Sequence, residues 1–388
     1  MSSRSWVLVV ALVAFAGCKE TVVPPPPPKP APPPAPKIVK PEASASVSGQ
    51  SDPQCIGPID LAVPAKLTIG GKQVERHGYK LTFPAVPEKK DAPTVFGVIA
   101  GINEDSGENM VNLKKFVDFF KAEKVDAILA VGDNGESIES IVRVMTPLAE
   151  TGLPVFTVLG NRECSGHFND AMAELQKKFS NVVNFSNVRH IEFGNVDLVS
   201  LPGYHDKRYI HCASGCQYFK QDIDALKPIA KAAKNPVVLV AHGPPHGATQ
   251  SALDAATEAG NVGDVNINGL VAEAAIPFGI FANIKEAGAR ATDLDGNNVI
   301  KPEVLSDKLY LNPGPADAVA WAMNDGTQSL GMAATLTVEG KQAKYKVFRA
   351  KALTTEEKAQ AAKLAPAAPK DPEPEPAKKD EKKEEAKK

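Results

Sequence analysis

The chain has 388 residues, with 44 basic and 46 acidic side chains and a formal net charge of −2. This length allows one large domain or two small ones, because a single core seldom grows beyond about 250 to 300 residues. The even charge balance gives no electrostatic reason to expect a nucleic acid as partner.

An export signal is predicted at the start of the chain. Arg4 precedes an apolar run over residues 6–16, which is too short to span a bilayer. The next residues, Phe-Ala-Gly-Cys at 15–18, resemble the lipobox of bacterial lipoproteins. This resemblance implies a signal peptide at 1–17 and a lipid on Cys18 that anchors the protein in the membrane. We therefore expect a cell-envelope location, on the outer membrane or the periplasmic face; an ordinary secretory signal is the alternative.

Both ends of the mature chain are expected to be disordered. Residues 18–52 are rich in Pro, and residues 353–388 consist mostly of Lys, Glu, Ala and Pro. Such segments bury too little apolar surface to offset their chain entropy. The first would act as a stiff tether, since runs of Pro favour an extended polyproline helix.

Four cysteines remain for the folded part: Cys55, Cys164, Cys212 and Cys216. An even number of thiols in an oxidising compartment favours disulfides, and their pairing stays open. The alternative is a zinc site in which Cys212 and Cys216 join His205 or His211. It is less favoured, because the Cys-x-x-x-Cys pair has no second pair to complete four ligands.

The folded part is predicted to be α/β. Apolar and polar residues alternate over 66–72, which runs into a Gly-Gly turn, and again over 79–83. This pattern predicts a small β add-on within residues 53–90. Short apolar runs then alternate with helical patterns over residues 91–352, which is typical of strands buried beneath helices. We expect strands at 95–100, 127–131, 155–159, 196–201, 237–241 and 278–281, helices at 112–124 and 137–150, and a last hairpin near 334–338 and 343–348.

Polar residues follow several of these strands, where ligands bind in such folds. They are Gly-Asp-Asn at 132–134, Gly-Asn-Arg-Glu at 160–163 and His-Gly-Pro-Pro at 242–245. Their order and spacing resemble the calcineurin-like metallophosphoesterases, as does Tyr-Leu-Asn-Pro-Gly at 310–314. The resemblance implies a sandwich of two mixed sheets flanked by helices. It also implies a site for two divalent metals (Mn, Fe or Zn), to which Asp133, Asn161 and His242 would contribute ligands.

The sequence departs from that family at several ligand positions. The opening Asp-x-His motif is replaced by Gly-Ile-Asn at 101–103, so Asn103 offers only a neutral oxygen. The late Gly-His-x-His motif is replaced by a stretch over 279–285 that has no imidazole and ends in Lys285. Arg162 stands where the family has a proton-donating His, and arginine cannot donate and regain a proton near neutral pH.

We therefore expect a degenerate phosphoesterase domain that binds an anionic ligand or partner, with Arg162 and Lys285 as candidate ligand-binding residues. One alternative is an active metal-dependent phosphoesterase with an altered site, rebuilt from nearby groups such as Glu104, Asp105, Glu163, His205 or His246. A second alternative is a purely structural envelope tether.

Overall fold

The computed structural model describes residues 51–84 and 92–366. The predicted signal peptide at 1–17, the predicted lipidation site Cys18, nearly all of the predicted 18–52 tether and the tail from residue 367 lie outside these ranges. Within them, no helix has both the length and the apolar character needed to cross a bilayer.

The first of two large sheets has six strands in the order β20-β19-β4-β5-β6-β7. They are β4 (Thr94–Ile99), β5 (Ala127–Val131), β6 (Val155–Val158), β7 (Val182–Asn184), β19 (Met332–Glu339) and β20 (Gln342–Arg349). Strands β4 to β7 are parallel, whereas β19 pairs antiparallel with both β4 and β20. The strands predicted at 95–100, 127–131 and 155–159 and the closing hairpin are therefore present in this sheet.

The second sheet has ten strands in the order β1-β2-β3-β8-β9-β10-β13-β16-β14-β15. They are β1 (Ala65–Ile69), β2 (Lys72–His77), β3 (Lys80–Thr82), β8 (His190–Phe193), β9 (Val196–Leu201), β10 (Val237–Ala241), β13 (Phe278–Ile280), β14 (Arg290–Thr292), β15 (Val299–Ile300) and β16 (Leu309–Asn312). Its centre is parallel from β9 through β10 and β13 to β16. Two small hairpins stand apart: β11 (Ala255–Ala256) with β12 (Gly260–Asn261), and β17 (Trp321–Ala322) with β18 (Gln328–Ser329).

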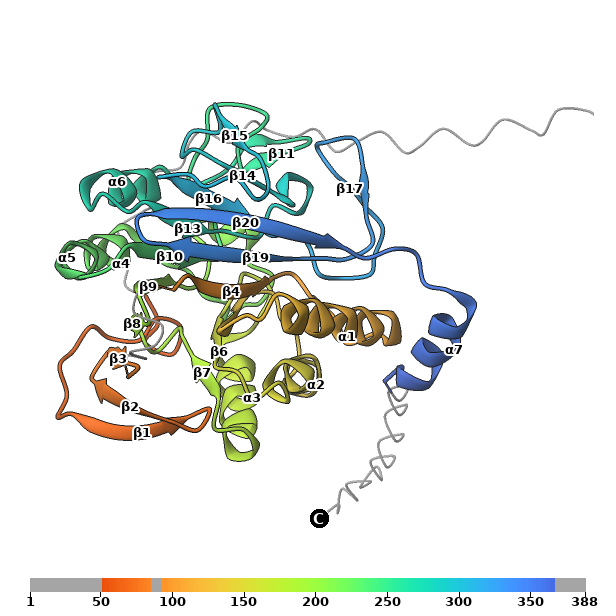
Figure 1. Cartoon of the computed structure of the whole chain (residues 1–388), viewed down its shortest axis with the longest axis horizontal. Helices are drawn as coiled ribbons and strands as arrows, with labels where there is room; N and C mark the ends of the chain where they lie inside the picture. The colour runs from red at the N-terminus through yellow and green to blue at the C-terminus, as the bar shows by residue number, and fades with distance from the viewer. Residues whose placement is uncertain (1–50, 85–91, 367–388) are drawn as a thin grey trace, which may run out of the picture. The chain divides into compact units, whose positions relative to one another are not determined.

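Helices cover both sheets (Figure 1). Beside the six-stranded sheet lie α1 (Gly107–Ala122), α2 (Ile138–Ala149) and α3 (Ser165–Lys178). Beside the ten-stranded sheet lie α4 (Lys220–Asp224), α5 (Leu226–Ala232) and α6 (Val265–Glu273). Two single turns of 3-10 helix, η2 (Lys207–Tyr209) and η3 (Lys285–Ala287), and a last helix, α7 (Thr355–Leu364), complete the described chain.

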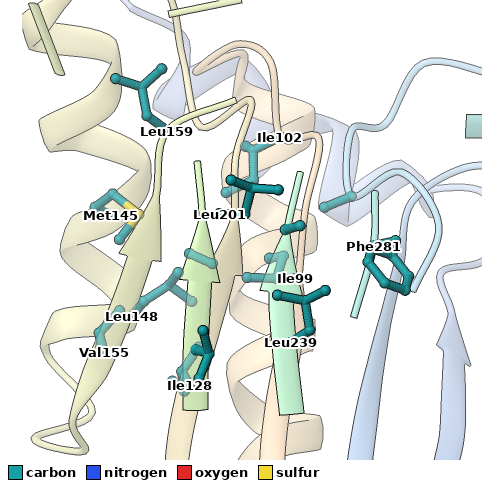
Figure 2. Close-up of a cluster of buried hydrophobic side chains, with 14 of the residues drawn as sticks. Ile99, Ile102, Ile128, Met145, Leu148, Val155, Leu159, Leu201, Leu239 and Phe281 are labelled. Atoms are coloured by element: carbon teal, nitrogen blue, oxygen red, sulfur yellow. The ribbon is translucent and has the colours of Figure 1, made fainter. Parts of the chain in front are cut away.

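The core has an inner layer between the sheets and an outer layer beneath the helices, because successive residues of a strand point to opposite faces. On β4, Phe96 and Val98 belong to the inner layer, whereas Ile99 packs in the outer layer with Phe116 and Phe120 of α1. In Figure 2, side chains from β4, β5, β6 and α2 form one cluster that also includes residues of the ten-stranded sheet. The protein is therefore the predicted sandwich of two mixed sheets flanked by helices.

The predicted β add-on is a hairpin that extends the second sheet. Its strands β1 and β2 pair antiparallel, with Ile69 opposite Lys72 across the Gly-Gly turn. Strand β3 then pairs in parallel with β8, from Lys80 opposite His190 onward. The hairpin is thus one end of the ten-stranded sheet.

The prediction of a disordered segment from residue 353 is wrong for residues 355–364, which form α7. The side chains of Thr354 and Glu357 make a reciprocal capping box at its start. Glu357 also pairs with Lys115 of α1 at 2.9 Å. Ala361 of α7 is buried so close to Gly107 of α1 that a side chain on Gly107 would clash with the carbonyl group of Ala361. Small residues let the two helices approach closely, so α7 is ordered despite its polar composition.

Of the four candidate cysteines, Cys164 and Cys212 form a disulfide. Cys55 and Cys216 are buried free thiols. The zinc alternative is wrong, because the sulfur of Cys212 is already bonded to Cys164.

Candidate metal and ligand site

Three of the predicted ligands meet at the carboxyl ends of the central strands. Asp133 follows β5, Asn161 follows β6 and His242 follows β10, and all three are buried. The turn after β5 requires glycine at its first position, because Gly132 has φ +81° and a Cβ there would lie 2.5 Å from Nδ1 of His242. Asp133 follows with φ 56°, a conformation that Asp tolerates better than most residues. These turns aim side chains from both sheets at one point.

Hydrogen bonds fix the orientation of His242 and Asn161. Nδ1 of His242 lies 2.8 Å from the carbonyl oxygen of Val131. That oxygen can only accept, so Nδ1 carries a hydrogen and donates it. Nδ2 of Asn161 donates to the carbonyl oxygen of Tyr209 at 2.6 Å, so its Oδ1 must point the other way. Oδ1 of Asn161 consequently lies 2.9 Å from Nε2 of His242, and Oδ1 of Asp133 lies 3.4 Å from the same nitrogen.

This arrangement suits a cation. In a neutral imidazole with its hydrogen on Nδ1, Nε2 is an acceptor that faces two further acceptor oxygens. These three acceptors, Nε2 of His242, Oδ1 of Asn161 and Oδ1 of Asp133, can be satisfied by a second proton on His242 or by a positive ion bound among them. Ligands bonded to one ion at about 2.1 Å, with angles of about 90 to 110°, lie about 3.0 to 3.4 Å apart, close to the separations seen here. A donor that fixes the far ring nitrogen is also usual for a metal-binding histidine.

Two buried carboxyl groups, those of Asp133 and Glu163, lie close to this point. Oδ1 of Asp133 accepts the backbone N–H groups of Asn161 and Arg162, each at 3.1 Å. Glu163 lies beneath it, and its oxygens accept the N–H groups of Asn134 at 2.6 Å and Gly160 at 3.0 Å. Burial, and then the nearby Asp133, raise the pKa of Glu163 to about 8. Glu163 therefore supports the two turns through its hydrogen bonds and, with this raised pKa, is mostly protonated near neutral pH.

A second cation fits poorly on the other side of Asp133. The cavity there measures ≈ 10 Å³, which is room for about one water molecule. Asp133 is the only carboxylate lining it, and Lys285 is the only cationic residue. Nζ of Lys285 bonds Oδ2 of Asp317 at 3.1 Å and lies 4.7 Å from the centre of the Trp321 ring. An ammonium group thus occupies the wall where a second metal would need ligands.

Asn103 belongs to this Lys285 group. Its amide donates to Asp317 and to the carbonyl oxygen of Gly101, while its backbone N–H donates to the carbonyl oxygen of Asp133 at 2.8 Å. Oδ1 of Asn103 and Oδ1 of Asp317 are buried and have no hydrogen-bond partner. The ammonium group of Lys285 is therefore paired with Asp317, and not with Asp133, Asn161 or His242.

Arg162 lies at the rim. Its guanidinium pairs with Glu136, whose side chain is 56 % exposed, and its Nε is buried without a partner. A surface pair of this kind contributes about 0 to 1 kcal/mol, so an anion could replace Glu136 at little cost. The structure therefore leaves Arg162 suited to binding an anion and offers it no means of cycling a proton.

Three other candidates, Asp105, His205 and His246, contact other partners. The ring of His205 packs on Tyr204 with centroids 4.5 Å apart, and burial lowers the pKa of His205. Nδ1 of His246 lies 3.5 Å from Oδ2 of Asp254. Asp105 pairs with Arg143 at 3.1 Å. These contacts bind Asp105, His205 and His246 to partners other than Asp133, Asn161 and His242.

Asp317 and Tyr209 were not predicted from the sequence. The backbone N–H of Asp317 donates to the carbonyl oxygen of Gly101 at 3.1 Å. Asp317 comes five residues after the end of β16, so a carboxylate shortly after a buried strand was the sequence signal that could have identified it. Tyr209 acts through its backbone carbonyl, which no side-chain pattern reveals.

A separate group of His190, Glu192 and Asp197 has potential ligand atoms within 4.8 Å of one another. These groups already satisfy each other and their neighbours. Lys80 pairs with Glu192, and Asp197 bonds Nε2 of His190 at 2.5 Å and the N–H of Asn235 at 2.9 Å. The group joins β3, β8 and β9 as a structural network.

Comparison with protein families matches the central part of the chain. Residues 105–267 match the family model described as calcineurin-like phosphoesterase. The chain carries a calcineurin-like phosphoesterase domain. The matched part of the phosphoesterase domain includes Asp133, Asn161 and His242, and it excludes Asn103 and Lys285. A search of curated protein sequences finds no match.

Solved structures similar to the phosphoesterase domain come from several organisms. A protein from Thermus thermophilus shares 11 % identity over 66 % of this chain and 98 % of its own, with a TM-score of 0.43. A dimetal phosphatase from Danio rerio shares 14 % identity over 66 % and 98 %, with a TM-score of 0.40. The anchor protein of the inner membrane complex of Plasmodium shares 15 % identity over 71 % and 95 %, with a TM-score of 0.40. None of these likenesses bears on activity.

Proposed function

We propose that this domain binds one divalent cation through Asp133, Asn161 and His242, and that the loaded site holds a phosphate-bearing ligand without turning it over efficiently. The observation that carries the proposal is the orientation of His242. Its Nε2 faces the two oxygens at 2.9 and 3.4 Å while its Nδ1 is held by Val131. A cation supplies the positive charge that this arrangement needs.

The residues around the site favour binding over hydrolysis. A metal ion would supply Lewis-acid polarisation of a phosphate oxygen and an activated water. The chain's own part in hydrolysis would be to hold a second ion and to protonate the leaving group. Lys285 and Asp317 form an ion pair beside the position for a second ion, and Arg162 cannot cycle a proton near neutral pH. Arg162 is instead placed to bind an anion at the rim.

The second candidate is a slow phosphoesterase that works with one ion. The three convergent ligands favour it, because a single ion can still bind a phosphate oxygen and a water molecule. It differs from the first candidate only in turnover, so both can be tested on one preparation.

The proposal places this protein in the cell envelope, anchored by a lipid on Cys18. The charged start, the apolar run and the lipobox-like residues support this location. The disulfide between Cys164 and Cys212 also supports it, because disulfides persist mainly in oxidising compartments.

Calorimetric titration of the full chain with bis(p-nitrophenyl) phosphate, with and without Mn²⁺, tests the function. We expect Mn²⁺-dependent binding that weakens in Arg162→Gln and is lost in His242→Ala, with p-nitrophenol release at the background rate. His77→Ala, which removes an exposed imidazole from β2, is the matched control and should bind like the wild type. Release of p-nitrophenol that depends on both Mn²⁺ and His242 would instead establish the enzyme. Binding that ignores Mn²⁺ would refute the proposal.

A further inference from the structure

A loop over residues 206–216 lies against the strand-end segment 160–163. Cys164, the next residue after that segment, forms the disulfide with Cys212 in the loop. Backbone contacts run alongside: Cys164 pairs with Gly215 in an isolated β-bridge, and the N–H of Ser165 donates to the carbonyl oxygen of Ser214 at 3.1 Å. The disulfide thus joins the loop to the chain three residues after Asn161.

The same loop holds Asn161 on two sides. The carbonyl oxygen of Tyr209 accepts from Nδ2 of Asn161 at 2.6 Å, and the N–H of His211 donates to the carbonyl oxygen of Asn161 at 2.9 Å. An amide group is planar, so fixing Nδ2 also fixes the direction of Oδ1. That oxygen points at Nε2 of His242, 2.9 Å away. The position of the loop therefore sets the direction of a proposed metal ligand.

Side-chain packing contributes little to that position. Six residues of the loop are exposed: Lys207, Arg208, Tyr209, His211, Ala213 and Ser214. Burial of apolar surface is the main stabilising term for most segments, and it is small here. The disulfide and the backbone hydrogen bonds are the main restraints, beside the buried Cys216 and the contact of the Tyr209 ring with Tyr204, whose centroids lie 6.3 Å apart.

We propose that the Cys164–Cys212 disulfide positions Asn161, so that the cation affinity of the site depends on the oxidation state of this bond. This inference rests on the proposed function. A dithiol reductant would break the S–S bond by exchange, delivering two electrons and two protons to the sulfurs while becoming a disulfide itself. The loop then keeps its backbone bonds and the contact of Tyr209 with Tyr204 but loses its covalent link to the chain beside Asn161, so the amide of Asn161 is held less firmly. Loss of a group that orients a metal ligand typically lowers affinity by about 10- to 100-fold.

The test is a titration of the full chain with Mn²⁺, in which the electron paramagnetic resonance signal of free Mn²⁺ gives the dissociation constant. The oxidised chain is compared with a chain reduced by dithiothreitol and then freed of the reagent without air. We expect a dissociation constant about 10- to 100-fold higher after reduction, recovery on reoxidation, and the same weak binding in Cys164→Ser/Cys212→Ser. Cys55→Ala, which removes a buried thiol but keeps the disulfide, is the control and should bind like the oxidised wild type.

The outcomes separate the two proposals. Affinities that agree within about twofold before and after reduction would overturn the positioning role while leaving the cation site intact. An oxidised chain that binds no Mn²⁺ would overturn both. Loss of the far-ultraviolet circular dichroism of the domain on reduction would show that the disulfide supports the whole fold, which also overturns the specific role. A Co²⁺ visible spectrum that changes on reduction, while the circular dichroism stays constant, would support it.

Discussion

Replacing Lys285 by methionine removes the positive partner of a buried carboxylate. Nζ of Lys285 lies 3.1 Å from Oδ2 of Asp317, and the two side chains are 19 % and 2 % exposed. At this distance, with an effective dielectric constant of about 20, opposite unit charges attract by about 5 kcal/mol. Removing one partner of a buried pair costs about 3 to 5 kcal/mol, and the partial exposure of Lys285 reduces this. We expect Lys285→Met to lower the free energy of unfolding by about 3 kcal/mol.

The assay is urea unfolding in a chelator, with two further variants. The double variant Lys285→Met/Asp317→Asn should recover most of the lost stability, because it also removes the unpaired buried carboxylate of Asp317. Lys227→Met is the matched control: its side chain is 21 % exposed, but its partners Asp224 and Glu273 are 41 % and 54 % exposed. That change should cost less than about 1 kcal/mol. A loss in Lys285→Met no larger than in the control would refute the view that this ammonium neutralises Asp317 in place of a metal.

Three further predictions concern other supports of the fold and the site. Gly132→Ala should lower the free energy of unfolding by about 1 to 2 kcal/mol because of its left-handed backbone, and it should abolish Mn²⁺ binding by displacing His242. The control is Gly152→Ala, which has φ +74° and no atom within 4 Å and should show only the loss of stability. Equal Mn²⁺ titrations of the two variants would contradict this. Because the pKa of Glu163 is raised from 4.5 to about 8, the folded state binds its proton more tightly, so unfolding free energy in chelator should fall as pH rises through this window. In Glu163→Gln the unfolding free energy should depend less on pH. An unchanged pH dependence would show that another group causes it. Thr354→Ala should lower the stability of α7 by about 1 kcal/mol, seen as faster amide exchange confined to that helix.

Much of the fold could be predicted because buried strands have a local signature. The runs at 127–131, 196–201 and 237–241 coincide with β5, β9 and β10, since the burial of both faces of a strand leaves an uninterrupted apolar stretch. Helix α7 was missed because its composition is polar. The residues that order it are the Thr354–Glu357 capping box, visible in the sequence, and the close contact with Gly107, which only the tertiary structure brings about.

The candidate site could be predicted only in part. Asp133, Asn161 and His242 follow buried strands, so their meeting point follows from strand order. Whether Lys285 would fill that point could not be inferred, because its direction depends on Asp317 and Trp321, which lie more than thirty residues further along the chain. Likewise, the control of Asn161 comes from a backbone carbonyl, and any residue type at position 209 could supply it.

We propose that the chain holds one cation and not two. This can be tested by anomalous diffraction from a crystal of the chain soaked in Mn²⁺. We expect a single peak, bonded to the carboxylate of Asp133, Oδ1 of Asn161 and Nε2 of His242, with Lys285 still paired to Asp317. Two peaks sharing Asp133, or no peak at these residues, would contradict it.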